Sequence, residues 1–385
     1  MKTPIRIAIG IMLAHSVWVA VQADTPNPSV TASAPINQFK LPNIAHAVAK
    51  PLPQVSVQPE TQVDALIKSV ANPINYGEPG VSYGAAGKNA AAAEVLTESA
   101  SSPDAIADAA AAQEIATPAD LGTSGQPYTT SRTSSQGLIA GRSYPFSAAG
   151  KLVFTVPSNP GYIYLCSAAL IKPGVIVTAA HCVAEFGANQ FYANWAFYPA
   201  VDGGKAAYGY TPAHQVFAPT SYLNGTDTCA VSGVVCQDDV AVIVLKSNVG
   251  KTHGYFSYAW NGYSFNTNGE TQITQLGYPM ALDKGVWQER TDSLGYTSTS
   301  LSNNTIIGSL QTGGSSGGPW VVNLGIQPVL NGTSFGQAPN PNVIVGVTSW
   351  GFNCTGIKQQ GASPFTSNNI APLVNEACSA NPKAC

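Results

Sequence analysis

Three short strings of the sequence carry side chains that can act together in acyl transfer. His181 follows an apolar run, Asp239 opens another, and Ser316 lies in the glycine-rich turn 313–319. A serine hydroxyl is a poor nucleophile near neutral pH, so Ser316 needs a base within hydrogen-bond reach, and a histidine can serve as that base. An aspartate can then hold the imidazole in the required tautomer and stabilise its cationic form.

Taken singly, each string has an ordinary structural interpretation. A lone histidine is more often structural, an acid at a strand edge can lie in water, and glycine-rich turns are common. Together, the order His181, Asp239, Ser316 matches one of the chain orders known for the nucleophilic triad. We expect Asp239 rather than Asp238 to be the acid, because side chains alternate along a strand and only one of the two faces the site.

The chain from Arg142 to Cys378 resembles the chymotrypsin-like serine endopeptidases. Hallmark strings of that family look like Thr-Ala-Ala-His-Cys, Asp-Val-Ala and Gly-x-Ser-Gly-Gly-Pro, and these occur here in order at 178–182, 239–241 and 314–319. The family pattern also places the acid directly before Val-Ala. The resemblance implies a serine endopeptidase in which the three candidate residues form the catalytic triad.

The resemblance extends to the surroundings of the nucleophile. It implies that the backbone N–H groups of Gly314 and Ser316 form the oxyanion hole, where each donor contributes about 3 kcal/mol in comparable enzymes. It also implies that the string Ser349-Trp350-Gly351 forms the strand that pairs with the substrate backbone. We expect these residues to line one continuous binding cleft.

The residue preference is predicted from the position six before the nucleophile. By the resemblance, Leu310 lies at the base of the primary specificity pocket, with Gln311, Ser349 and Gly351 as its walls. An apolar base offers no carboxylate to a Lys or Arg side chain, which disfavours trypsin-like specificity. Glutamyl enzymes carry a histidine before the Trp-Gly pair, and this chain has Ser349. We therefore expect a preference for apolar or small uncharged residues.

One position departs from most trypsin-type enzymes, which carry an aspartate immediately before the nucleophile. Ser315 stands there in this chain. A neutral hydroxyl cannot form the ion pair with a new N-terminus that activates those enzymes. The glutamyl-endopeptidase branch also lacks this aspartate, and the strings 144–154 and 276–279 look like that branch. The resemblance therefore favours a bacterial secreted, glutamyl-endopeptidase-like member.

The elements that position these residues are predominantly short strands. Apolar or alternating runs separated by turn residues predict strands at 151–156, 162–166, 174–178, 240–245, 271–276 and 343–349. A single clear helical period occurs at 368–378, where apolar residues recur at spacings of three and four. These runs predict an all-β sandwich or barrel, and about 240 residues provide room for one large core or for two six-stranded barrels. The resemblance implies the second arrangement, two six-stranded antiparallel barrels with a C-terminal helix, forming a protease domain over residues 138–385.

All seven cysteines lie within that domain. By the resemblance, Cys166 and Cys182 form the disulfide beneath the catalytic histidine. Cys229 and Cys236 are expected to close a short loop ahead of Asp239. The remaining expectation is that Cys354 pairs with either Cys378 or Cys385, which leaves one cysteine unpaired because the count is odd.

The first 23 residues predict an export signal. Basic residues precede the apolar run 7–21, and Val21 and Ala23 stand at the two positions that a signal peptidase reads, so we expect cleavage after Ala23. The run contains His15 and Ser16 and is shorter than the ~20 residues needed to span a bilayer, which disfavours a membrane anchor. We expect a secreted protein, with the periplasm as the alternative location.

Residues 24–137 have no cysteine, no tryptophan and only four aromatic residues. So few large side chains bury little apolar area, and we expect this region to be mostly disordered or loosely helical. A short helix is possible at 61–70, and 85–116 is alanine-rich. Two interpretations stay open: a pro-region that assists folding or masks a site, and a flexible spacer. Arg132 and Arg142 are candidate processing points.

Composition restricts the partners. The 385 residues carry 17 Lys+Arg and 20 Asp+Glu, a formal net charge of −3, which leaves no basic patch for nucleic-acid phosphates. No cysteine pair shows zinc-ligand spacing with histidines, so we expect neither metal nor other cofactor. The predicted function is a monomeric, secreted serine endopeptidase acting on proteins or peptides, with no membrane span after signal removal. The alternative is a catalytically silent homologue that binds polypeptide through 349–351.

Overall fold

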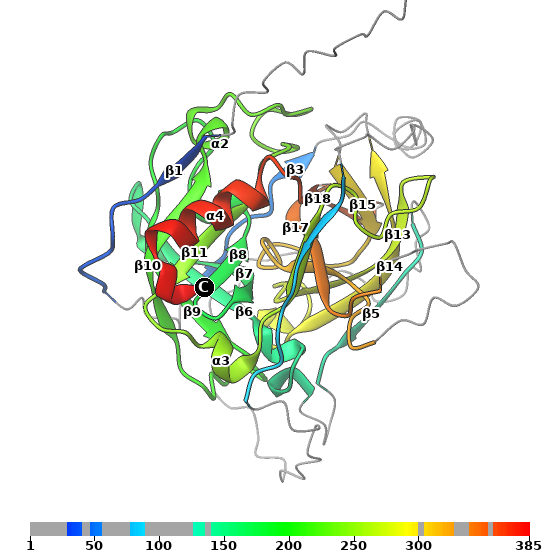
Figure 1. Cartoon of the computed structure of the whole chain (residues 1–385), viewed down its shortest axis with the longest axis horizontal. Coiled ribbons are helices and arrows are strands. Elements are labelled where there is room, and N and C mark those ends of the chain that lie inside the picture. The colour runs from blue at the N-terminus through cyan, green and yellow to red at the C-terminus, as the bar shows by residue number, and fades with distance from the viewer. Residues whose placement is uncertain are drawn as a thin grey trace, which may run out of the picture.

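The structure is a computed structural model in which strands predominate (Figure 1). It describes residues 29–40, 47–55, 78–88, 126–134, 140–298, 304–326, 339–352 and 357–385. The predicted export signal, the helix at 61–70 and all but the first residues of the alanine-rich stretch 85–116 lie outside this described part.

Six antiparallel strands form a first closed barrel. They are β6 (Ala149–Val156), β7 (Asn159–Lys172), β8 (Val175–Thr178), β9 (Ala193–Pro199), β10 (Thr211–Pro219) and β11 (Ala241–Leu245). The spatial order is β6-β7-β8-β11-β10-β9, and β9 pairs again with β6. Strands β8 and β11 are buried at every position, which explains why both are continuous apolar runs in the sequence.

Six further antiparallel strands form a second closed barrel. They are β13 (Glu270–Gly277), β14 (Glu289–Ser298), β15 (Asn304–Gly308), β16 (Pro319–Val322), β17 (Val343–Phe352) and β18 (Gln359–Pro364). The order is β13-β14-β15-β18-β17-β16, and β16 pairs again with β13. The predicted architecture of two six-stranded barrels is confirmed.

The connections contain one more strand and several short helical turns. Strand β12 (Ser257–Trp260) pairs in parallel with β17. The turns are α2 (Thr220–Asn224), α3 (Gly250–His253), η2 (Ala140–Arg142), η3 (Phe146–Ala148), η4 (Ala180–Cys182), η5 (Asp283–Gly285) and η6 (Pro382–Ala384). Among these, η4 carries one of the candidate catalytic residues.

The predicted C-terminal helix is present as α4 (Ile370–Ala380). The side chain of Asn369 caps its first turn by accepting a hydrogen bond from the Ile370 N–H at 2.6 Å. The apolar face of α4 packs on the core of the first barrel, where Leu373 is fully buried (Figure 1).

The pairing expected for Cys354 is wrong. Cys378 and Cys385 form a disulfide with each other, across a Cα–Cα distance of 5.7 Å. The reason is local: α4 ends at Ala380, and η6 turns the last residues back beside the final turn of the helix. Cys354 itself lies outside the described residues.

Parts of the N-terminal region add strands to the barrels. They are β1 (Val30–Ala32), β2 (Ala47–Ala49), β3 (Gln54–Val55), β4 (Gly80–Ser82) and β5 (Tyr128–Arg132). β1 pairs with β10, β2 with β7, β3 with β17, β4 with β12 and β5 with β14. The prediction of a disordered or loosely helical region is therefore wrong for these stretches, because neighbouring strands of the barrels supply hydrogen bonds and apolar cover that the segments lack alone. Within the described residues, no helix has the length and apolar character needed to cross a bilayer.

Candidate active site

His181 and Asp239 meet at one edge of the first barrel. Strands β8 and β11 are antiparallel neighbours in which Thr178 lies opposite Ala241. Because His181 follows the end of β8 and Asp239 precedes β11, the register brings both to the same place. The backbone N–H of His181 donates to Asp239 Oδ1 at 2.8 Å, and its ring Nδ1 lies 2.8 Å from Asp239 Oδ2. The carboxylate thus fixes both the backbone and the imidazole.

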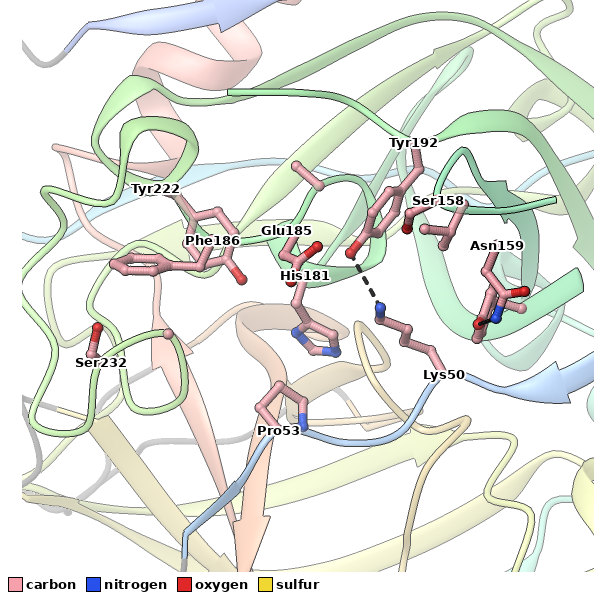
Figure 2. A pocket seen from close by; sticks show the side chains of 14 residues that line it. Lys50, Pro53, Ser158, Asn159, His181, Glu185, Phe186, Tyr192, Tyr222 and Ser232 are labelled. Carbon is pink, nitrogen blue, oxygen red and sulfur yellow. Dashed lines mark hydrogen bonds between the residues drawn. The ribbon is translucent and has the colours of Figure 1, made fainter. Parts of the chain in front are cut away.

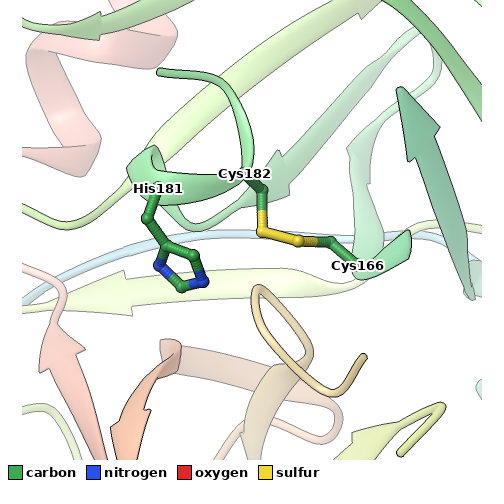
Figure 3. Close-up of side chains that lie close together, drawn as sticks. All are labelled: Cys166, His181 and Cys182. Atoms are coloured by element: carbon green, nitrogen blue, oxygen red, sulfur yellow. A yellow bond between two sulfur atoms is a disulfide. The ribbon is translucent and has the colours of Figure 1, made fainter. Parts of the chain in front are cut away.

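A disulfide supports the histidine from below. Cys166 on β7 is bonded to Cys182 on η4, directly beside His181 (Figure 3). The second expected disulfide, Cys229–Cys236, is also present in the structure, ahead of Asp239. In each of these places two sulfurs and a third ligand-type side chain lie close together, but the sulfurs are joined to each other and are not available as metal ligands.

Ser316 lies in a tight loop held by β7. Ser167 donates its N–H to the Ser316 carbonyl at 2.7 Å and its hydroxyl to the Gly314 carbonyl at 2.8 Å. Gly314 has φ +96°, and a Cβ there would come within 2.5 Å of the Tyr278 carbonyl oxygen, so glycine is required. The glycine-rich string therefore serves to place Ser316 and the neighbouring amides beside the histidine edge.

The candidate nucleophile Ser316 and the candidate base His181 are both buried and are not hydrogen-bonded to each other. Neither Ser316 Oγ nor His181 Nε2 has a hydrogen-bond partner among the described residues. The structure thus brings the imidazole and the acid together, while the contact between the hydroxyl and the imidazole is not formed in this conformation. Hydrogen bonds of this kind often tighten only when substrate is bound.

Ser315 and Asp238 are the chain neighbours of Ser316 and Asp239 and carry the same side-chain types, but their side chains have other hydrogen-bond partners. The Ser315 hydroxyl donates to the Thr312 carbonyl at 2.7 Å, so this position is satisfied locally and without an ion pair. Asp238 points away from the imidazole and accepts from the Ser221 hydroxyl at 3.2 Å. This agrees with the expected alternation of side chains at the start of β11.

Asp238 belongs to a buried acidic pair. Its N–H donates to Asp227 Oδ2 at 2.8 Å. Burial, followed by the nearby charge of Asp238, raises the pKa of Asp227 to about 8. Burial also raises the pKa of Asp238. One carboxyl group of this pair therefore carries a proton near neutral pH.

The side chain of Ser349, predicted to be a wall of the specificity pocket, is directed at the candidate acid. Its hydroxyl donates to Asp239 Oδ2 at 2.5 Å, and the residue is completely buried. The hydroxyl is directed at the acid because a buried carboxylate oxygen is the strongest acceptor within its reach. Side-chain direction within β17 cannot be read from the string Ser-Trp-Gly alone.

The other residues predicted to bind substrate are distributed along the second barrel. Leu310 is half-buried, whereas the Gln311 side chain is buried and donates to Thr291 Oγ1 at 3.3 Å. Trp350 packs inside the barrel and donates its indole N–H to an asparagine at 2.6 Å. Gly351 donates its backbone N–H to the Pro53 carbonyl at 2.9 Å.

A cavity lies beside His181 and includes residues that the sequence did not single out. Its walls include Glu185, Tyr192 and, from the N-terminal region, Lys50 and Pro53 (Figure 2). Lys50 donates to the Tyr192 hydroxyl at 3.1 Å. The signal that could have indicated this contact is the string Lys-Pro-Leu-Pro at 50–53, an extended pattern in a region otherwise interpreted as disordered.

Two closed antiparallel barrels with a His–Asp pair at the edge of one and a glycine-rich serine loop against it define the chymotrypsin-like fold. Residues 140–371 match the family model described as Trypsin. The chain therefore belongs to the trypsin family.

The individual relatives share low sequence identity with this chain. The glutamyl endopeptidase of Bacillus licheniformis is 26% identical over 148 residues, which cover 38% of this chain and 40% of that protein. The alignment thus spans less than half of that relative. Among solved structures, protease Anisep from Arthrobacter nicotinovorans is 24% identical, with a TM-score of 0.46 over 60% of this chain and 96% of that one. A Glu endopeptidase in complex with MPD is 20% identical, with a TM-score of 0.46 over 65% and 96% of the two chains.

Proposed function

We propose that this protein is an exported serine endopeptidase that hydrolyses peptide bonds through an acyl-enzyme intermediate on Ser316. The observation that carries the proposal is the doubly hydrogen-bonded pair of His181 and Asp239 beside the loop of Ser316. Membership of the trypsin family supports the same assignment. Asp239 holds Nδ1 of the imidazole as a donor, which leaves Nε2 free to accept a proton.

In the proposed first step, Ser316 Oγ attacks the carbonyl carbon of the substrate while His181 Nε2 takes the hydroxyl proton. The negative charge that develops on the carbonyl oxygen is stabilised by the backbone N–H groups of Gly314 and Ser316. The imidazolium then gives its proton to the amide nitrogen as the C–N bond breaks, and the amine leaves. Water repeats the sequence on the ester and releases the acid.

The proposed cleft lies between the barrels, with the acyl side of the substrate along 349–351 and the leaving amine towards His181. An apolar residue is preferred before the cleaved bond because Leu310 provides no charge at the base of the pocket. Export is supported by the N-terminal signal pattern and by the three disulfides, which persist in oxidising compartments.

The proposal is tested by hydrolysis of casein with a matched pair of serine variants. Ser316→Ala is expected to abolish hydrolysis, whereas Ser315→Ala, which changes a buried serine in the same loop, should retain it within a few-fold. Circular dichroism controls for folding. If processed, folded wild type does not cleave casein but binds peptide as strongly as Ser316→Ala does, the protein is a silent homologue and the proposal is wrong.

A further inference from the structure

The described segment 47–55 crosses from one barrel to the other at the candidate active site. Its first part, β2, pairs with β7 at Ile163–Leu165, immediately before Cys166. Its last part, β3, pairs with β17 at Gly351 and Phe352. Between these strands the chain passes in front of His181, where Figure 2 shows Lys50 and Pro53 on either side of the imidazole.

The segment occupies the backbone positions that the proposed function assigns to substrate. The Gly351 N–H donates to the Pro53 carbonyl at 2.9 Å, and the Lys50 N–H donates to the Leu165 carbonyl at 2.9 Å. The Lys50 carbonyl lies against the nucleophile loop, since a Cβ on Gly313 would be 3.1 Å from it. A substrate and this segment cannot be present together.

The direction of the segment is opposite to that of a cleavable substrate. In the proposed reaction the acyl side lies along β17 and the leaving amine faces His181, so a substrate runs from β17 towards β7. Residues 47–55 run from β7 to β17. Both pairings are parallel, at Ala47–Ala49 with β7 and at Gln54–Val55 with β17. In this direction the nitrogen of a peptide bond at Ser316 points away from the imidazole, and His181 cannot protonate it.

Leu52 reaches the predicted specificity pocket. Its side chain is only 6% exposed, and a Cβ on Gly351 would lie 2.7 Å from Leu52 Cδ2. Gly351 is the expected wall of the primary pocket, so the leucine fills the space at the entrance. This matches the apolar preference expected from Leu310, because an apolar side chain gains free energy by leaving water there.

Lys50 provides a second anchor on the other side of His181. Its ammonium lies 4.9 Å from the centroid of the Tyr192 ring and 5.3 Å from that of Tyr164, and it donates to the Tyr192 hydroxyl. Burial lowers the pKa of Lys50, and the negative charge of Glu185 acts in the opposite direction. The aromatic rings and the acid thus form a site for one cationic side chain.

The prolines prepare the segment for this binding mode. Pro51 and Pro53 have restricted φ angles, and each keeps the preceding residue extended. The extended backbone at 50–53 therefore loses little conformational entropy when it docks. Neither proline needs an acceptor for an N–H, and the Pro53 carbonyl is the atom that Gly351 binds.

We propose that residues 47–55 are a built-in inhibitor that lies backwards in the substrate cleft, held by Leu52 at the specificity pocket and by Lys50 in the site formed by Tyr164, Tyr192 and Glu185. This inference rests on the proposed function, because it assigns the cleft as the one that binds substrate. Ser316 Oγ and His181 Nε2 are both buried without a hydrogen-bond partner among the described residues, which is consistent with a covered site.

The test measures the rate at which a fluorophosphonate labels Ser316 in the full-length chain. Lys50→Glu combined with Leu52→Asp removes both anchors, and labelling is expected to be at least tenfold faster than in wild type. Lys40→Glu combined with Ile326→Asp makes the same changes at exposed positions and should leave the rate unchanged. Near-ultraviolet circular dichroism checks that all chains are folded.

The backward orientation of the segment is tested with a peptide of residues 47–55, Ala-Val-Ala-Lys-Pro-Leu-Pro-Gln-Val, added to the Lys50→Glu, Leu52→Asp variant. The peptide should slow labelling again and remain intact by mass spectrometry, whereas a scrambled peptide should do neither. If wild type is labelled as fast as the double variant, the inhibitor proposal is wrong while the peptidase proposal stands. Cleavage of the peptide overturns the backward orientation. If the folded double variant is not labelled by the fluorophosphonate and does not hydrolyse casein, both proposals are wrong.

Discussion

Ser349 donates its hydroxyl to Asp239 Oδ2, the same carboxylate oxygen that lies 2.8 Å from His181 Nδ1. Asp239 Oδ2 is therefore shared by the hydroxyl and the imidazole. We therefore expect Ser349 to position the acid through this hydrogen bond.

Ser349→Ala is expected to lower kcat roughly tenfold with little change in KM, because a hydrogen bond to a charged group contributes about 1.5–3 kcal/mol and part of it serves to orient the acid. Steady-state kinetics on a set of peptides that differ at the residue before the cleaved bond checks this. A change in the order of preferred residues, with kcat unaltered, would instead place Ser349 in the specificity pocket.

Asp239→Asn is expected to reduce kcat by a factor on the order of 10⁴, because an amide no longer selects the required imidazole tautomer. Asp238→Asn is the matched control: this carboxyl is half-buried and contacts Ser221 and not the imidazole. The kcat of Asp238→Asn should stay within about threefold of the wild-type value. Equal losses in the two variants would contradict the assignment of Asp239.

The pair of Asp227 and Asp238 predicts a pH-dependent stability. Burial and the neighbouring Asp238 raise the folded-state pKa of Asp227 to about 8, above its value in the unfolded chain. A raised pKa stabilises the fold at low pH, and the contribution is lost as the pH rises towards 8. In a Ser316→Ala background, which prevents self-digestion, the free energy of unfolding should fall by up to about 4 kcal/mol between pH 5 and pH 8.5.

Asp227→Asn should reduce this dependence, because an amide does not titrate. Glu289, whose pKa burial raises to about 8, still contributes in the variant. Urea unfolding at both pH values measures the effect. If the variant and the parent lose the same stability over this range, the dependence has another origin and the assigned pKa shift is wrong.

Two disulfides that close loops of different length allow their effects on stability and on kcat to be compared. Replacing Cys166 and Cys182 by alanine is expected to lower the free energy of unfolding by about 3 kcal/mol, and replacing Cys378 and Cys385 by about 2.5 kcal/mol, from the closed loops of 16 and 7 residues. Only the first pair should also reduce kcat, since it lies beside His181. Denaturant midpoints and initial rates distinguish the two effects, and equal losses of kcat would contradict a local role.

Continuous apolar runs in the sequence were sufficient to predict the strands β8 and β11, which His181 and Asp239 adjoin. The two barrels and the pairing of these two residues were predicted from the resemblance to a known family. The paired strands β1–β5 could not be predicted. Each is short and has few large side chains, and its stability comes from partners on the barrels.

Two details depended on local geometry that the sequence does not encode plainly. The direction of the Ser349 hydroxyl is determined by the position of Asp239, a residue 110 positions earlier. The pairing of Cys378 with Cys385 depends on the turn that follows α4, whereas we expected Cys354 as the partner of one of them.

The most direct test of the central claim, that His181 and Asp239 activate Ser316 as a nucleophile, is the intact mass of the processed protein after reaction with a fluorophosphonate. The account predicts a single adduct located on Ser316 by peptide mapping, no adduct in Ser316→Ala, and labelling that is strongly slowed in Asp239→Asn but not in Asp238→Asn. An adduct on another residue, or none on folded and processed wild type, would contradict it.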